Sequence, residues 1–127
     1  MDQKKITILL CDDEKDLTET RKETLTRKGF HVLVANNGHE CLEILKETIP
    51  HVIVLDIKMP GMRGLEVLEK IRRGKNTKHI PVIINSVHNN DQHRKMAEKL
   101  KVAAYFPKPY RIGKIIEKIN EIISLQA

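Results

Sequence analysis

Polar residues stand at the ends of four short apolar runs, and their types suit one kind of chemistry. The runs and their last residues are ILLCDD with Asp12 and Asp13, HVIVLD with Asp56, IPVIINS with Ser86 and AAYFPK with Lys108. Neighbouring parallel strands bring their carboxyl ends to one edge of a sheet, so these side chains are expected to meet in one crevice. Carboxylates, a hydroxyl and an ammonium together favour binding of a divalent cation and a phosphoryl group.

The three carboxylates predict a metal site. Two carboxylates about 4 Å apart repel by roughly 4 kcal/mol at an effective dielectric near 20, and a hard divalent cation relieves that repulsion. Oxygen ligands with room for water favour Mg²⁺, or Mn²⁺, over zinc. For Asp12 and Asp13 an alternative stays open, because with Glu14 they could simply cap the following helix, whose amino end favours negative charge.

Asp56 is the candidate nucleophile. It interrupts a buried apolar run and precedes Ile57, so an ionised carboxylate there needs a partner. A carboxylate can attack phosphorus and form an aspartyl phosphate. Such a transfer depends on in-line positioning and charge neutralisation. Lys108 could neutralise the phosphoryl oxygens, and the Ser86 hydroxyl could donate a hydrogen bond to them.

Short apolar runs alternate with longer amphipathic ones, which is typical of an α/β domain. Strands are expected at 6–11, 31–35, 51–55, 80–85 and 103–106, and helices at 14–28, 38–48, 64–74, 90–100 and 111–125. Five such units with right-handed crossovers predict a flavodoxin-like, doubly wound parallel sheet in the order 2-1-3-4-5. The ends of the first and third strands then lie side by side. Residues 1–127 are expected to form a single domain.

Composition restricts location and partners. The longest apolar runs are too short for a membrane span and no signal peptide is apparent, so we expect a cytoplasmic protein. Cys11 and Cys41 are expected to be small buried side chains. The net charge of +6 lies on helix faces, in groups such as Arg21 with Lys22 and Arg72 with Arg73. We interpret these groups as solvated faces or a surface for an acidic protein. Direct nucleic-acid binding is not expected, because aromatics are only 3% and Trp is absent.

The sequence resembles a response-regulator receiver domain, the phosphoaccepting part of two-component signalling, in its chemotaxis-type single-domain form. The segments that carry the resemblance are ILLCDDE, VLDIKMPGMRGLEVLEKIR, PVIINS and AAYFPKP. The resemblance implies that Asp56 accepts a phosphoryl group from a sensor histidine kinase or a phosphotransfer protein. It also implies that Asp13, Asp56 and the backbone carbonyl of Lys58 bind Mg²⁺ directly, with Asp12 assisting.

The same resemblance implies a conformational response. Ser86 would move toward the phosphoryl group, and Tyr105 would swing inward with it. The Lys108–Pro109 peptide bond would be cis and would aim Lys108 at the site. The face built from helix four, strand five and helix five would then change, for a downstream protein that the sequence does not identify. The protein would be a monomer or a phosphorylation-dependent dimer.

Four positions depart from the family pattern or flank the site. Val87 follows Ser86 where Ala or Gly is usual, so we expect altered phosphorylation or dephosphorylation rates. Lys58 and His88 are expected to tune these rates as well. Asn85 stands where an apolar residue is common. It either influences the end of the fourth strand or points to solvent.

Other functions fit less well. A haloacid-dehalogenase-like phosphatase also uses a strand-end Asp and Mg²⁺, but it needs a second Asp where this chain has Lys58. A flavodoxin-like flavin binder would need a phosphate-binding loop after the first strand. Because the chain stops after the last helix, we expect a stand-alone receiver, a signalling phosphoacceptor rather than an enzyme. The alternative is a receiver cut from a multidomain transcription factor or a hybrid kinase.

Overall fold

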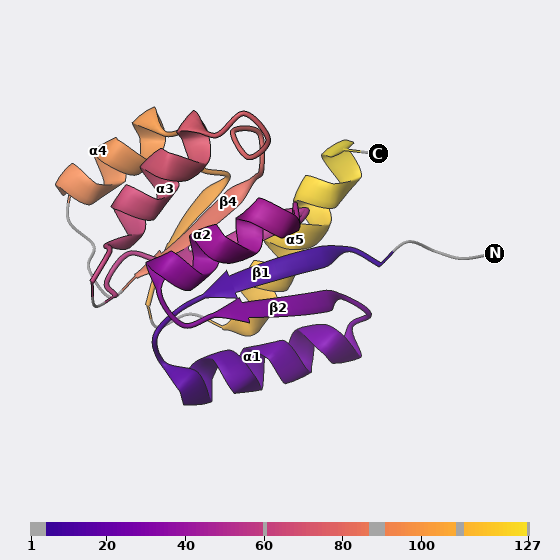
Figure 1. Ribbon diagram of the computed structural model, residues 1–127. Helices are drawn as coiled ribbons and strands as arrows, with labels where there is room; N and C mark the ends of the chain where they lie inside the picture. Colours follow the sequence, from indigo (N-terminus) through magenta and orange to yellow (C-terminus); the bar gives the residue numbers. More distant parts are fainter. Residues whose placement is uncertain (1–4, 60, 87–90, 109–110, 127) are drawn as a thin grey trace.

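The protein is described here by a computed structural model, which covers residues 5–59, 61–86, 91–108 and 111–126. Within these residues five strands alternate with five helices (Figure 1). In chain order they are β1 Thr7–Cys11, α1 Lys15–Arg27, β2 His31–Ala35, α2 Gly38–Glu47, β3 Val52–Asp56, α3 Gly64–Arg73, β4 Val82–Ser86, α4 Asp91–Lys99, β5 Ala104–Pro107 and α5 Ile112–Gln126.

All strand pairs are parallel, and the strand order is β2-β1-β3-β4-β5. The predicted flavodoxin-like α/β fold is therefore confirmed. The chain moves outward from β1 to β2 and then continues on the other side with β3. This reversal leaves the carboxyl ends of β1 and β3 next to each other, with Cys11 opposite Leu55 in register. In open α/β sheets ligands bind at such a point.

Each face of the sheet carries its own apolar cluster. On one face the strands pack against Cys41 and Leu45 of α2 and against Val67, Leu68 and Ile71 of α3. On the other face they pack against Leu25 of α1 and against Ile115, Ile119 and Ile122 of α5. Figure 1 shows α4 beside α3 and the long α5 along the sheet. Because both faces are covered, the strands are continuous apolar runs rather than alternating ones. Both cysteines are buried and free, as expected.

The elements begin and end within one or two residues of the predicted positions. The largest shift is in β4, which begins at Val82 rather than at residue 80. Pro81 has no N–H to donate to the sheet, although its carbonyl accepts a hydrogen bond of 3.0 Å from the N–H of Ile53. The third strand also includes Asp56, which pairs with Asn85.

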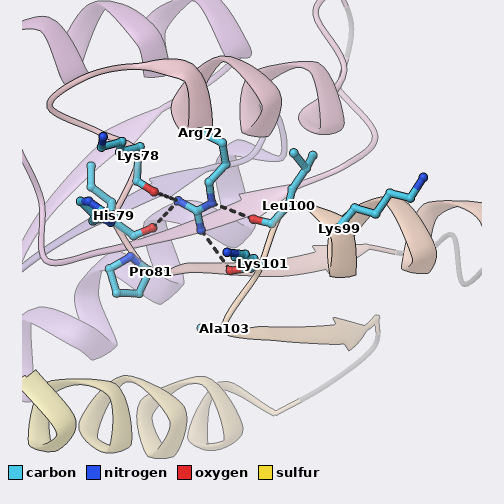
Figure 2. A pocket seen from close by; sticks show the side chains of 9 residues that line it. Arg72, Lys78, His79, Pro81, Lys99, Leu100, Lys101 and Ala103 are labelled. Atoms are coloured by element: carbon cyan, nitrogen blue, oxygen red, sulfur yellow. Dashed lines mark hydrogen bonds between the residues drawn. The ribbon is translucent and has the colours of Figure 1, made fainter.

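A cavity of about 540 Å³ lies at the opposite end of the sheet, before β4 and β5, and Arg72 of α3 is one of the residues that line it (Figure 2). The guanidinium donates to the carbonyls of Leu100 at 2.7 Å, Ile80 at 2.7 Å, Lys78 at 3.1 Å and Lys101 at 3.2 Å. The expectation that Arg72 belongs to a solvated face is therefore wrong. Its side chain joins α3 to the two segments that lead into β4 and β5.

Candidate functional site

The carboxyl ends of β1, β3, β4 and β5 bring the predicted site residues to one edge of the sheet. Asp12 directly follows β1, and its N–H continues the sheet by donating to Ala35 at 3.1 Å. Asp56 and Ser86 are the last residues of β3 and β4. The N–H of Lys108 donates to the carbonyl of Ser86 at 2.8 Å, which fixes the lysine backbone beside the site. Side chains from distant segments thus converge through strand order alone.

Three carboxylates form the acidic part of the site. Asp12, Asp13 and Asp56 each offer an oxygen, and these oxygens all lie within 4.8 Å of one another. Asp12 and Asp56 are only 2% and 3% exposed, while Asp13 is exposed. The Oδ1 atom of Asp56 is buried without a hydrogen-bond partner among the described residues. An oxygen-only set with an unsatisfied buried acceptor fits a hard divalent cation such as Mg²⁺.

Lys108 supplies the positive charge inside this cluster. Its Nζ lies 3.0 Å from Oδ2 of Asp12, 3.3 Å from Oε1 of Glu14 and 3.8 Å from Oδ2 of Asp56. Burial lowers the pKa of Lys108. The hydrogen bond to Asp12 and the charges of Asp56, Asp12 and Glu14 outweigh burial and raise that pKa above its ordinary value. Lys108 therefore remains an ammonium that partly neutralises the carboxylates of Asp12, Asp56 and Glu14.

Asp56 has a raised pKa, at about 6 instead of 3.8. Burial is the main cause, and the negative charges of Asp12 and Asp13 act in the same direction. The charge of Lys108 and a hydrogen bond from the backbone N–H of Lys58 oppose the rise. At neutral pH the carboxylate is still mostly ionised, which a nucleophile requires. Its ionised form is nevertheless costly in this site unless another cation arrives.

Gly64 lets α3 begin directly against Asp56. A Cβ atom at this position would lie 2.1 Å from the carbonyl oxygen of Asp56 and 2.6 Å from Cα of Ile57. The Gly64 N–H also donates to the Ile57 carbonyl at 2.8 Å. Only a residue without a side chain permits this approach. Ile57, which directly follows Asp56, is therefore held against the first turn of α3.

The two predicted switch residues, Ser86 and Tyr105, come from β4 and β5. Ser86 is fully buried at the end of β4. Tyr105 in β5 is half-buried and packs with the cluster beneath α2 and α3. The guanidinium of Arg94 in α4 lies 5.1 Å from the centroid of the Tyr105 ring, a cation–π distance. α4 and β5 are thus linked through the tyrosine ring.

Asn85 does not point to solvent. It is only 1% exposed, and its Oδ1 has no hydrogen-bond partner among the residues that the structure describes. It pairs in register with Asp56, and strand alternation puts both side chains on the face covered by α1 and α5. The solvent-facing interpretation of Asn85 is therefore wrong, and its influence on the end of β4 stays a prediction.

Arg21 is the residue that the sequence interpretation missed. Its residue type predicts a solvated position, but Arg21 is only 7% exposed, and its Nη1 lies 3.9 Å from Oδ2 of Asp12. With Thr18 and Leu25 it forms the buried face of α1. The signal in the sequence is its spacing, because residues three and four positions apart share one helix face.

Some predicted residues cannot be compared with the structure. Val87, His88 and Pro109 lie outside the described residues. Lys58 is exposed directly after the strand that carries Asp56. The predicted roles of these four residues stay predictions.

Comparisons with known proteins agree with this geometry. Transcriptional regulatory protein CpxR of Escherichia coli K12 is 33% identical over 116 residues, which cover 91% of this chain and 48% of CpxR. The chain thus spans about half the length of the curated relatives it matches. A CheY-like receiver domain protein of Methanospirillum hungatei superposes with a TM-score of 0.91 at 25% identity, covering 97% of both chains. The receiver domain of Francisella response regulator 1452 gives 0.87 at 27% identity, covering 96% of this chain and 99% of that one.

Among the described residues no helix combines the length and apolar character needed to cross a membrane. The response regulator receiver domain family matches residues 8–120, a range that runs from the second residue of β1 into α5 and contains Asp12, Asp13 and Asp56. With its strand order, its acidic cluster and its lysine in place, this chain belongs to the two-component response regulator receiver domain family.

Proposed function

We propose that this chain is a signalling phosphoacceptor, in which Asp56 takes a phosphoryl group from a sensor histidine kinase or a phosphotransfer protein. One observation carries the proposal. A buried Asp56 lies with Asp12 and Asp13 in a cluster of oxygens within 4.8 Å, and the Lys108 ammonium is 3.8 Å from it. Receiver family membership supports the same function and the kind of donor.

Asp13, Asp56 and the backbone carbonyl of Lys58 would hold Mg²⁺ or Mn²⁺ directly, with Asp12 assisting. The metal ion would supply charge neutralisation to the transferring phosphoryl group. An oxygen of Asp56 would bond to phosphorus while the bond from phosphorus to the donor nitrogen breaks. Lys108 would leave Asp12 to meet a phosphoryl oxygen, and the Ser86 hydroxyl would donate a hydrogen bond to another.

The response would be read on the face formed by α4, β5 and α5. Ser86 and Tyr105 would connect the phosphoryl group to that face, shifting an existing equilibrium between two states. Basic residues on this face favour an acidic docking surface on a downstream protein, and binding should weaken with salt. They are Arg94, Lys95, Lys99, Arg111 and Lys114. Lys58, Val87 and His88 would tune phosphorylation and dephosphorylation rates.

The proposal treats residues 1–127 as one receiver domain in the cytoplasm, where an ATP-dependent kinase can supply phosphate. We do not propose that this domain binds nucleic acid directly. The protein would be a monomer or a phosphorylation-dependent dimer. A second possibility is a receiver that belongs to a longer transcription factor or hybrid kinase. This possibility is favoured by the curated relatives, of which the chain spans about half.

The phosphoacceptor proposal is tested with a small phosphodonor. Wild-type protein and Asp56→Asn are incubated with acetyl phosphate or phosphoramidate and Mg²⁺, and intact masses are measured. We expect the wild type to gain one phosphoryl group and the variant to gain none. A chelator should abolish the gain in the wild type. A phosphorylated Asp56→Asn, or a wild type that never gains mass, would contradict the proposal.

A further inference from the structure

Arg21 puts a buried positive charge on α1 beside the acidic cluster. The face of α1 that packs on the sheet consists of Thr18, Arg21 and Leu25, so its middle position carries a charge where an apolar side chain would serve packing. The arginine side chain is 8% exposed and faces an Asp12 side chain that is 3% exposed. A buried guanidinium is costly unless it is paired with an anion. Its position therefore points to a role toward Asp12.

Asp12 is held at both of its oxygens. Oδ1 accepts a hydrogen bond from the Glu14 N–H at 3.0 Å. Oδ2 accepts a hydrogen bond from Nζ of Lys108 at 3.0 Å and lies 3.9 Å from Nη1 of Arg21. Two cations thus share a single oxygen. The lysine forms the closer contact, and the arginine forms an ion pair from the α1 side.

The proposed reaction would separate Lys108 from Asp12. Nζ is 3.0 Å from Asp12 but 3.8 Å from Asp56, so contact with a phosphoryl group on Asp56 draws the ammonium away from its present partner. A buried carboxylate that is left without any cation is strongly destabilised. Arg21 reaches Asp12 from a different element and does not depend on where Lys108 goes.

We propose that Arg21 is a positioning residue that acts through Asp12. It keeps this carboxylate paired while Lys108 transfers to the phosphoryl group on Asp56. The inference rests on the proposed function, because the phosphoryl group is what draws Lys108 away. Nothing in the receiver resemblance assigns a role to this position.

The same charge has an opposite effect on the metal ion. Arg21 is close to an oxygen of the acidic cluster, so it repels a divalent cation that binds there. It should therefore weaken binding of Mg²⁺ alone. It should strengthen binding of an anionic phosphoryl analogue, both by its charge and by releasing Lys108. A residue that served packing alone would not move these two affinities in opposite directions.

The test compares Arg21→Met, Arg21→Gln and Arg21→Lys with the wild type. Met keeps a long flexible apolar side chain, Gln keeps a polar one, and Lys restores the charge. The matched control is Arg27→Met on the same helix, since the Arg27 side chain is 76% exposed and pairs with Glu23 on the helix surface. Mg²⁺ affinity is measured by calorimetry, and beryllofluoride affinity by fluorine NMR at saturating Mg²⁺.

We expect Arg21→Met and Arg21→Gln to bind Mg²⁺ about tenfold more tightly and beryllofluoride about tenfold more weakly, the size of one partly screened charge interaction. Arg21→Lys should recover most of both wild-type values, and Arg27→Met should match the wild type. Circular dichroism and thermal unfolding establish which variants are folded. If only one of Arg21→Met and Arg21→Gln folds, that variant alone is enough for the test. Two affinities that move together, or do not move, overturn the inference. If the wild type itself binds no beryllofluoride, the proposed function fails instead.

Discussion

At the scale of single residues, burial of Asp56 ties the stability of the protein to pH. The pKa of Asp56 is about 6 in the folded protein and 3.8 ordinarily, so the folded state holds this proton more tightly than the unfolded state does. Below pH 3.8 the group is neutral in both states and costs nothing. As pH rises from about 4 to about 6, ionisation of Asp56 progressively lowers the free energy of unfolding. Above pH 6 the full loss of stability persists.

Asp56→Asn should therefore be more stable than the wild type at neutral pH. The gain should approach about 3 kcal/mol, from 1.36 kcal/mol per pKa unit, and it should shrink as pH falls from about 6 to about 4. Urea unfolding of both proteins in chelator across this range measures the difference. A stability difference that does not change with pH would show that the charge of Asp56 is not its source.

Gly64 gives a second prediction at this scale. In Gly64→Ala the added Cβ would meet the Asp56 carbonyl oxygen at 2.1 Å, and backbone atoms cannot yield cheaply. We expect a loss of about 1–3 kcal/mol in the free energy of unfolding and weaker Mg²⁺ binding, because the end of β3 must shift.

Gly113 in α5 is the matched control for this variant. A Cβ atom there would meet nothing within 4 Å, so Gly113→Ala should be neutral or slightly stabilising, since alanine favours helix. Denaturant unfolding and calorimetry with Mg²⁺ measure both variants. Equal effects of the two substitutions would refute the close-approach explanation.

At the scale of elements, Arg72 joins α3 to the segments before β4 and β5. Its guanidinium donates hydrogen bonds to four backbone carbonyls, and Arg72→Met would leave these acceptors without it. Since hydrogen bonds from a charged donor are the stronger kind, we expect a loss of about 2–4 kcal/mol in the free energy of unfolding. Arg72→Lys should not restore it, because an ammonium lacks the planar fork.

Arg73 is the neighbouring control. Its side chain is 78% exposed and pairs with Glu69 on the helix surface, so Arg73→Met should change stability by no more than about 0.5 kcal/mol. Folded Arg72→Met should still accept a phosphoryl group at Asp56, because the hydrogen bonds of Arg72 lie at the other end of the sheet. Comparable losses in the two variants would contradict the role given to Arg72.

At the scale of the whole molecule, the cluster of Asp12, Asp13 and Asp56 should make the stability of the protein depend on Mg²⁺. A ligand that binds only the folded protein stabilises it by mass action, by about 2.7 kcal/mol at one hundred times its dissociation constant. Mg²⁺ should therefore raise the thermal midpoint of the wild type at neutral pH, and a chelator should reverse the rise. The gain should be much smaller in Asp56→Asn, which lacks a charged ligand of the cluster. An equal rise in both proteins would place the bound ion elsewhere.

The position of the acidic site could be predicted from residue order. Asp12 directly follows the apolar strand β1, and Asp56 and Ser86 are the last residues of β3 and β4. A parallel sheet brings such strand ends together whatever the details of packing. Lys108 could be placed for the same reason. The hydrogen-bond partner of each site residue could not be predicted, because distances such as that from Lys108 to Asp12 depend on side-chain packing.

The sequence by itself determined the elements, their order and the residues at the carboxyl edge, because apolar periodicity and strand ends are local properties of the chain. Only the tertiary structure decided the environment and the contacts of the Arg21, Arg72 and Asn85 side chains. By residue type the two arginines suit a solvated helix face, yet one pairs with Asp12 and the other with four carbonyls. A polar side chain becomes buried only where distant segments supply its partner or enclose it, and local sequence does not encode that partner.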